Sequence, residues 1–392
     1  MRIAYFVHDV NDAAVAKRIR LLTGAGVQFT LLGFRRTPTA PQTVEGAPVV
    51  DLGQTADAKL LQRAGSVAAN LLQIGRWRSI LCSADVVMAR NLEVLVLAAA
   101  ARRLHAPTAR LIYECLDIHG LMLRANAAGA ALRSLESGLL NASDLLIVSS
   151  PAFLGQYFEP FQAVSQRPRL ETLLLENKTL PPPGMDRADR PALAPLPPWR
   201  IGWFGMIRCR RSLDLLCGLA RRRPDLVQVE IRGRPSYTEF DDFNRQTGAT
   251  PGVTFGGPYA AEDLADMYGS VHFNWSIDYF QDDGNSRWLL PNRLYEGGCF
   301  AVPPIAREGS ESSLWLARRG LGISLKAPEE ELEPFLRALS PQRYEAMVQS
   351  CRAAPRQDFV IGARDGLDLA QKLLGKAERP PAALGTPVMR EA

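Results

Sequence analysis

The chain has 392 residues, which is longer than a single hydrophobic core usually extends, so two domains are expected. Its hydrophobic fraction of 47% and its charged fraction of 22% are ordinary for a globular protein. The net charge of +5 is small and no module of interleaved basic and aromatic residues occurs, so nucleic-acid binding is disfavoured.

The first half of the chain alternates predicted strands and helices. The first helix is expected to follow Asp12, whose side chain suits the N-cap, and to end at Gly24 and Gly26. Such alternation predicts a parallel, doubly wound sheet with helices on both faces. The strands predicted in this half span residues 3–7, 27–33, 85–89, 110–114 and 145–149.

Residues 57–82 carry an apolar stripe next to a basic end that contains Arg76 and Arg78. One interpretation is an amphipathic helix that rests on a bilayer surface. The other, which we favour, is an ordinary core helix with a basic end. The stripe consists of Leu60, Leu61, Ala64, Val67, Ala68, Leu71, Leu72 and Ile74.

A second α/β series follows a proline-rich segment. Its strands are predicted at residues 200–204, 228–233, 253–256, 271–275 and 300–305, with a helix at 213–221. We therefore expect an α/β fold of two Rossmann-like, doubly wound domains that face a cleft. The expected boundaries are 1–178 for the N-terminal domain, 179–199 for the linker and 200–377 for the C-terminal domain. Residues 378–392 are rich in proline and small residues and are expected to be a disordered tail.

Cysteine and histidine usage argues against a structural zinc site. The six cysteines form no C-x-x-C pair and only four histidines are present. Scattered cysteines fit reduced thiols in the cytoplasm. The sequence begins directly with a predicted strand, so no signal peptide is expected, and no apolar run reaches the ~18 residues of a spanning helix.

A basic turn follows the first strand of the second half. It contains Gly205, Arg208, Arg210 and Arg211 just before a predicted helix. Glycine permits close backbone approach, a helix N-terminus favours an anion, and arginine binds phosphate through two hydrogen bonds. The segment therefore favours phosphate binding over an ordinary solvent-facing basic turn.

Ionisable residues also follow strands of the first half. Glu114, Asp117 and His119 lie at and beyond one strand end, where open α/β sheets place their chemistry. Asp117 or His119 can act as a general base on a hydroxyl group, although an aspartate at such a place often only caps the next helix. The ends of two further strands share this edge of the predicted sheet, and they carry His8, Asp9, Arg90 and Asn91.

The segment of residues 285–298 is the most informative part of the chain. Pro291 suits the first position of a helix, and Arg293 and Glu296 then share one helix face. A helix start with free N–H groups and an arginine suits a diphosphate, and the glutamate suits sugar hydroxyls. A surface ion pair between Arg293 and Glu296 is the other interpretation. Upstream, Trp275 and Asp278 are candidates to contact a sugar, and the adjacent Asp282 and Asp283 do not suggest a metal site.

With these segments together, the chain resembles glycosyltransferases of the GT-B fold. It is most similar to the large family 4-like group, in its bacterial exopolysaccharide (succinoglycan-type) branch. The resemblance covers nearly the whole chain. It is carried by residues 113–117, 175–178, 201–214, 253–259, 263–268 and 290–296, the last of which is similar to the family segment LPNKLFE.

The resemblance implies roles for individual residues. Arg211 takes the place of the family's diphosphate-binding lysine, Arg293 is expected at the phosphates, and Glu296 is expected on the ribose hydroxyls. The full set expected to bind the donor is Gly205, Arg208, Arg211, Asp278, Asn285, Ser286, Asn292, Arg293 and Glu296. The catalytic candidates are Asp117, His119, Glu114 and Asp9, and the acceptor-side candidates are His8, Arg90 and Asn91.

Three departures from the family pattern bear on the mechanism. Trp288 stands where the family has the first of two glutamates, and Leu116 replaces a histidine before Asp117. His8 and Asp9 begin a segment that replaces the family's glycine-rich loop. These changes favour an inverting reaction with Asp117 as the base, instead of the retaining reaction of ordinary family 4 members.

We therefore expect a cytoplasmic, metal-independent glycosyltransferase of bacterial exopolysaccharide assembly. It would transfer a hexose or hexuronate from a UDP-sugar to a saccharide on a polyprenyl diphosphate, without a further cofactor. If residues 57–82 rest on a bilayer, the basic residues Arg76 and Arg78 would hold the protein at the inner leaflet of the membrane. Two alternatives stay open: a GT-B epimerase or hydrolase that acts on a UDP-sugar, and a non-catalytic nucleotide-sugar-binding assembly subunit.

Overall fold

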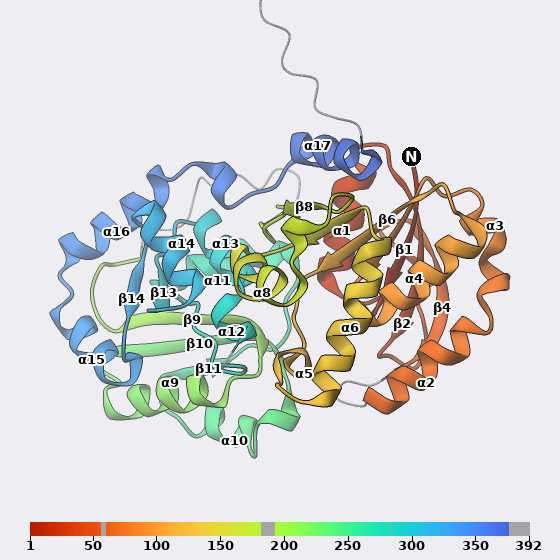
Figure 1. Cartoon of the computed structure of the whole chain (residues 1–392). Helices are drawn as coiled ribbons and strands as arrows, with labels where there is room; N and C mark the ends of the chain where they lie inside the picture. Colours follow the sequence, from red (N-terminus) through yellow and green to blue (C-terminus); the bar gives the residue numbers. More distant parts are fainter. Residues whose placement is uncertain (56–59, 182–192, 283, 376–392) are drawn as a thin grey trace, which may run out of the picture. The chain divides into compact units, whose positions relative to one another are not determined.

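A computed structural model describes residues 1–55, 60–181, 193–282 and 284–375 (Figure 1). By contacts between Cα atoms the chain forms two compact units. Unit 1 comprises residues 1–89, 93–112 and 362–392, and unit 2 comprises residues 90–92 and 113–361. The predicted tail, the middle of the predicted linker and Asp283 lie outside the described residues.

The first sheet has eight strands in the order β3-β4-β2-β1-β5-β6-β7-β8. Apart from β3 and β4, which pair antiparallel, the pairings of β1 with β2 and β5, of β2 with β4, and of β7 with β8 are parallel. The strands are β1 (Arg2–Val7), β2 (Gln28–Arg35), β3 (Thr43–Val44), β4 (Ala47–Gln54), β5 (Val86–Arg90), β6 (Arg110–Cys115), β7 (Leu145–Val148) and β8 (Glu171–Leu174).

Helices connect these strands as the alternation predicted. Asp12 is the N-cap of the first helix and accepts a hydrogen bond from Ala14 N at 2.9 Å, which confirms the predicted helix start. The helices of this part are α1 (Ala13–Thr23), α2 (Leu60–Leu71), α3 (Arg78–Leu81), α4 (Leu92–His105), α5 (Gly120–Leu123), α6 (Ala127–Ala142), α7 (Pro151–Phe153) and α8 (Glu159–Gln162).

The second sheet has six strands in the order β11-β10-β9-β12-β13-β14, and all its pairs are parallel. Counted from its first strand, this is the 3-2-1-4-5-6 order of a Rossmann fold. The prediction of an α/β protein with two parallel, doubly wound sheets is confirmed. The strands are β9 (Trp199–Ile207), β10 (Val227–Pro235), β11 (Val253–Phe255), β12 (Phe273–Trp275), β13 (Pro304–Arg307) and β14 (Ile323–Leu325).

Helices lie on both sides of the six-stranded sheet. In Figure 1, α9 and α10 lie on one side of it and α13 and α14 on the other. The helices are α9 (Arg210–Arg222), α10 (Phe243–Gly248), α11 (Leu264–Gly269), α12 (Asn285–Trp288), α13 (Asn292–Cys299), α14 (Glu311–Arg319), α15 (Pro328–Ala338), α16 (Pro341–Ala353) and α17 (Ala363–Leu374). The last of these, α17, belongs to unit 1 and lies against α1.

Buried tryptophans organise the core of unit 2. Trp199, Trp203, Trp275 and Trp315 are each at most 1% exposed. A buried indole needs an acceptor for its N–H. Trp199 donates to the carbonyl of Leu336 at 3.1 Å, and Trp275 donates to Ser212 Oγ at 3.0 Å. Trp275 therefore faces the core, and the prediction that it contacts a sugar is wrong.

Two predicted boundaries are corrected by the structure. Pro291 is the N-cap of α13, with extended backbone, and the helix begins one residue later than predicted. The strand predicted at 300–305 begins only at Pro304, because Phe300 still closes α13 with its N–H bonded to the carbonyls of Gly297 and Gly298.

Candidate functional site

The predicted donor-binding residues lie at the carboxyl ends of β9 and β12 and on the segment that follows β12. Gly205 is near the end of β9 and has φ of 106°, which glycine adopts without strain. The neighbouring strand approaches it closely: a Cβ on Gly233 would lie 1.8 Å from the carbonyl oxygen of Gly205. Gly233 was not singled out from the sequence, since only the strand register reveals that it faces Gly205.

Arg208 and Arg293 gather near Asp278. Arg208 donates to Asp278 Oδ2 at 3.1 Å, and Asp278 is only 8% exposed in its side chain. Arg293 is buried and donates to the carbonyl of Ile277 at 3.1 Å. Its Nε is buried and has no hydrogen-bond partner among the described residues.

Burial lowers the pKa of Arg293, and repulsion from Arg208 lowers it further, whereas Asp278 opposes these effects. A buried guanidinium with an unsatisfied Nε is costly unless an anion compensates it. The pair Arg208 and Arg293 thus provides excess positive charge next to a single carboxylate. This is the electrostatic environment that a diphosphate requires.

Arg211 lies at the start of α9 and is half-exposed. It forms an ion pair with Glu329, and this hydrogen bond raises the pKa of the guanidinium. Its guanidinium also lies 4.2 Å from the ring centroid of Tyr279, and that of Arg307 lies 4.9 Å from the same ring. Arg307 and Glu329 were missed because they lie far along the chain from Arg211, at the end of β13 and at the start of α15.

Hydrogen bonds hold the segment from 285 to 292 in its conformation. Asn285 is 3% exposed, and Ser286, at 6% exposed, accepts from Gln281 N through its Oγ at 2.8 Å. Asn292 is exposed at the start of α13 and accepts a hydrogen bond from Asn177.

A small pocket at the carboxyl ends of β12 and β13 is lined by Asp278, Ser286 and Arg307 among others.

Glu296 lies one turn into α13 and is half-buried. Its Oε2 accepts a hydrogen bond from the hydroxyl of Tyr268 at 3.0 Å. The carboxylate therefore points toward α11. It does not pair with Arg293, which donates to the carbonyl of Ile277 and accepts from Asn274 through its own carbonyl. The alternative interpretation, a surface ion pair between these two residues, is not what the structure has.

Asp117 and His119 lie on the segment that follows β6, and both are exposed. His119 is the N-cap of α5, with Nδ1 accepting from Leu121 N at 3.2 Å, so the capping role considered for Asp117 belongs to His119. Ile118 N donates to Asn285 Oδ1 at 3.3 Å. This bond joins the segment of Asp117 to the predicted donor segment within unit 2.

Glu114 and Arg90 form a buried pair. Glu114 is 0% and Arg90 is 1% exposed, and the Nε and Nη2 atoms of Arg90 both lie 2.9 Å from Glu114 Oε2. The neighbouring Asn91 has φ of 72° and donates its N–H to the carbonyl of Glu114 at 2.9 Å. The structure thus brings the three predicted residues together at the ends of β5 and β6.

His8 and Asp9 follow β1 in unit 1. His8 Nε2 lies 4.0 Å from Asp12 Oδ2, and Asp9 Oδ1 accepts from Asn11 N at 3.0 Å. Both residues shape the turn that leads into α1.

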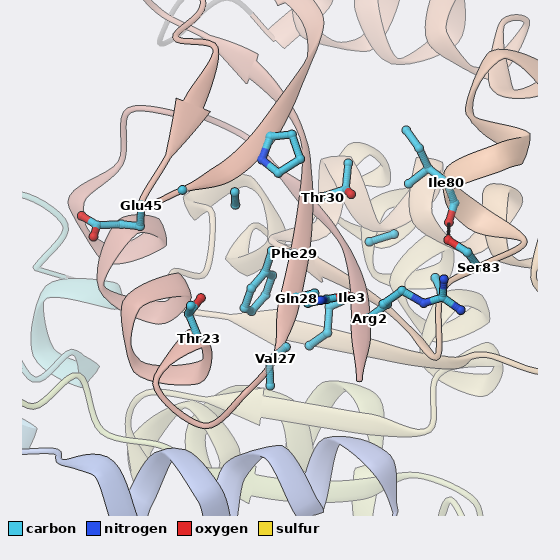
Figure 2. Close-up of a pocket in the computed structure, with 15 residues that line it drawn as sticks. Arg2, Ile3, Thr23, Val27, Gln28, Phe29, Thr30, Glu45, Ile80 and Ser83 are labelled. Carbon is cyan, nitrogen blue, oxygen red and sulfur yellow. Dashed lines mark hydrogen bonds between the residues drawn. The ribbon is translucent and has the colours of Figure 1, made fainter.

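A pocket of about 430 Å³ lies elsewhere in unit 1 (Figure 2). It is lined by the amino ends of β1 and β2, including Arg2, Gln28 and Phe29, and by the turn that contains Glu45. None of the predicted site residues lines it. Since parallel sheets place their chemistry at the opposite, carboxyl ends of the strands, we assign no role to this pocket.

Glu136 on α6 is a buried acid that the sequence did not indicate. It is 1% exposed and accepts hydrogen bonds from Tyr113 Oη at 2.9 Å, Tyr157 Oη at 2.6 Å and Gln162 Nε2 at 2.8 Å. Burial raises its pKa to about 7 although these hydrogen bonds oppose the shift. The cluster is joined to β6 through Tyr113, which lies shortly before Asp117 in the sequence.

The described residues hold neither a metal-binding cluster nor a helix that could span a membrane. Among them, no group of three or more His, Cys, Asp or Glu side chains is placed to hold a metal ion. In the same described ranges, no helix has both the length and the apolar character needed to cross a membrane.

Similarity to known proteins shows which family the chain belongs to. No protein-family model matches it. The succinoglycan biosynthesis protein ExoL of Rhizobium meliloti (strain 1021) is 43% identical over 350 residues, which cover 88% of this chain and 86% of ExoL.

Solved structures show the same fold. Sucrose-phosphate synthase of Thermosynechococcus elongatus matches with a TM-score of 0.70 and 14% identity, over 95% of this chain and 98% of that one. Anabaena HepE, solved with UDP and glucose, matches with a TM-score of 0.67 and 15% identity, over 96% of this chain and 100% of HepE. By its identity to ExoL and by this fold, the chain belongs to the succinoglycan-type exopolysaccharide branch of the GT-B glycosyltransferases.

Proposed function

We propose that the protein transfers a hexose or hexuronate from a UDP-sugar to a polyprenyl-diphosphate-linked saccharide in exopolysaccharide assembly. The observation that carries this proposal is the hydrogen bond between Ile118 N and Asn285 Oδ1. It joins a segment with an exposed carboxylate, Asp117, to the segment that carries the candidate donor residues. A transferase needs its general base and the leaving group of the donor to lie close to each other.

The donor diphosphate is proposed to bind Arg208, Arg211 and Arg293. The buried, unsatisfied Nε of Arg293 supports this role, because an incoming phosphate oxygen would complete its hydrogen bonds. Glu296 is proposed to accept hydrogen bonds from the ribose. HepE, which shares the fold, is seen with UDP and glucose, and this supports UDP as the nucleotide.

Asp117 is proposed as the base that takes the proton of the acceptor hydroxyl in an inverting reaction. His119 is less suited, because its Nδ1 already accepts a backbone N–H. Glu114 and Arg90 are proposed to hold the strand ends, since their carboxylate and guanidinium are buried against each other.

The test is the variant Asp117→Asn, assayed with a panel of UDP-sugars and lipid-linked saccharides. We expect transfer to fall by about 10²–10⁴-fold, the usual contribution of general base catalysis, while UDP binding persists. The matched control Asp266→Asn changes an exposed aspartate on α11 and should keep full transfer. Near-normal transfer by Asp117→Asn would sink the assignment, and the anomeric configuration of the product, read by NMR, tests inversion.

The same assay separates the alternatives. An epimerase or hydrolase would consume the UDP-sugar without any acceptor. A non-catalytic subunit would bind UDP and turn over neither substrate, and Trp288 in place of a family glutamate is the feature that favours it.

The lipid-linked acceptor suggests a membrane contact through α2 and the turn after it. The described side chains of α2 are exposed or half-buried, so the interpretation as a core helix does not hold for them. Leu72 is 90% exposed, Arg76 and Arg78 are exposed, and Ile74 and Trp77 are buried. We propose that this surface binds anionic lipid. Liposome flotation should show binding that is lost in Leu72→Ser combined with Arg76→Ser, and wild-type protein that does not float would remove the proposal.

A further inference from the structure

The hydrogen bond between Tyr268 and Glu296 joins α11 to α13 at the candidate ribose position. The hydroxyl of Tyr268 lies 3.0 Å from Glu296 Oε2. Glu296 is half-buried, so part of its carboxylate remains accessible to a ligand. A carboxylate offers about four acceptor sites on its two oxygens, so it can accept from Tyr268 and from further donors.

Tyr268 itself is fixed by packing. Its side chain is 0% exposed. The ring stacks on Phe300 at a centroid distance of 5.6 Å and meets the edge of Phe204 at 5.0 Å. Burial and the negative charge of Glu296 raise the pKa of Tyr268 well above its ordinary value, so the hydroxyl stays protonated and donates. Its direction is therefore determined by the core of unit 2.

Tyr259 approaches Glu296 as well. Burial and, after it, the negative charge of Glu296 raise the pKa of Tyr259 above its ordinary value. The hydroxyl of Tyr259 also lies 3.9 Å from the position that a Cβ on Gly205 would occupy. Tyr259 thus lies beside the glycine turn at the end of β9.

We propose that Tyr268 is a positioning residue that orients the carboxylate of Glu296 toward the 2′- and 3′-hydroxyls of the nucleotide. This inference rests on the proposed function, which assigns the ribose to Glu296. A glutamate held by a fixed tyrosine hydroxyl loses less side-chain freedom when the ligand binds, so more of the interaction appears as affinity. The bond from Tyr268 would therefore increase the selectivity of the site for ribonucleotides.

The test uses two ligands, UDP and 2′,3′-dideoxyuridine diphosphate, whose dissociation constants are measured by calorimetry. Wild type should bind UDP more tightly than the dideoxy compound. Tyr268→Phe keeps the ring that packs on Phe204 and Phe300 and removes only the hydroxyl. We expect it to weaken UDP binding by about 3- to 10-fold and to leave binding of the dideoxy compound unchanged.

The matched control is Tyr157→Phe, which removes a tyrosine–carboxylate bond of 2.6 Å to Glu136. It should change neither dissociation constant. Tyr268→Phe added to Glu296→Ala should weaken UDP no further than Glu296→Ala alone.

Two outcomes would overturn the inference and leave the proposed function standing. Tyr268→Phe could weaken both ligands equally, which indicates a merely structural role, or it could leave UDP binding intact. Wild type that binds UDP and the dideoxy compound equally would also overturn it. If wild type binds no UDP at all, the proposed donor site fails together with the inference.

Discussion

The buried carboxyl of Glu136 predicts a specific pH dependence of stability. Its pKa in the folded protein is about 7, against an ordinary value of 4.5, because burial disfavours the charged form. Each pKa unit corresponds to about 1.4 kcal/mol, so ionising Glu136 costs the folded state about 3 kcal/mol. Between these two pKa values the folded protein keeps a proton that the unfolded chain releases, and the free energy of unfolding therefore falls as pH rises.

The perturbation is Glu136→Gln. A glutamine fits the cluster with its oxygen at the position that accepts from Tyr157 and Gln162, while its amide donates to Tyr113. The variant cannot ionise, so its stability lacks this pH-dependent loss. From about pH 5 to about pH 8, the free energy of unfolding of the variant should rise relative to wild type by about 2–3 kcal/mol.

The assay is urea unfolding of both proteins across this pH series. Glu262→Gln changes an exposed glutamate of unit 2 and should keep the wild-type profile. Parallel profiles for wild type and Glu136→Gln would refute the reasoning, because they would mean that Glu136 titrates alike in the folded and unfolded states.

Two further predictions concern the strand ends around the site. Arg90→Leu should destabilise the protein by about 3–5 kcal/mol in chemical unfolding, because it leaves the charge of Glu114 buried without its partner; a loss below about 1 kcal/mol would contradict this. Gly233→Ala should reduce thermal stability strongly, since its Cβ would lie 1.8 Å from the carbonyl oxygen of Gly205 and its φ is 141°. The control Gly138→Ala lies in α6 with nothing within 4 Å of the new Cβ and should be tolerated; equal melting temperatures for the two variants would contradict the prediction.

Local signals made much of the fold predictable. Asp12 lies before an apolar repeat and caps α1 as expected, and the alternation of strands and helices gave two parallel sheets. The boundaries at Pro291 and Pro304 were missed because an X-Pro step fits a helix cap, a first helical turn or a strand start equally well. The membership of α17 in unit 1 depends on long-range packing that no local pattern encodes.

The candidate site was predictable only in part, for the same reason. Arg208, Asp278 and Arg293 were named from their places at strand ends and a helix start, and the structure brings them together. Trp275 was misjudged, because periodicity does not distinguish a ligand-facing indole from one that bonds to a buried serine. The sequence indicated Tyr268 only as part of a segment that resembles the family. Its bond to Glu296 could not be foreseen, because it spans 28 residues of sequence.

The expected domain boundaries, the site roles and the membrane contact stay predictions. The site roles and the membrane contact depend on a bound ligand or a partner. Nucleotide binding by the segment around Glu296 underlies all of the proposed chemistry.

The most direct test is a thermal shift with UDP, GDP and ADP on wild type, Glu296→Ala and the control Glu262→Ala. A ligand that binds only the folded state stabilises it by about 2.7 kcal/mol at a hundred times its dissociation constant. We predict that UDP raises the melting temperature of wild type and of the control, and that this rise is lost in Glu296→Ala. No shift with any nucleotide, or an equal shift in Glu296→Ala, would contradict the account.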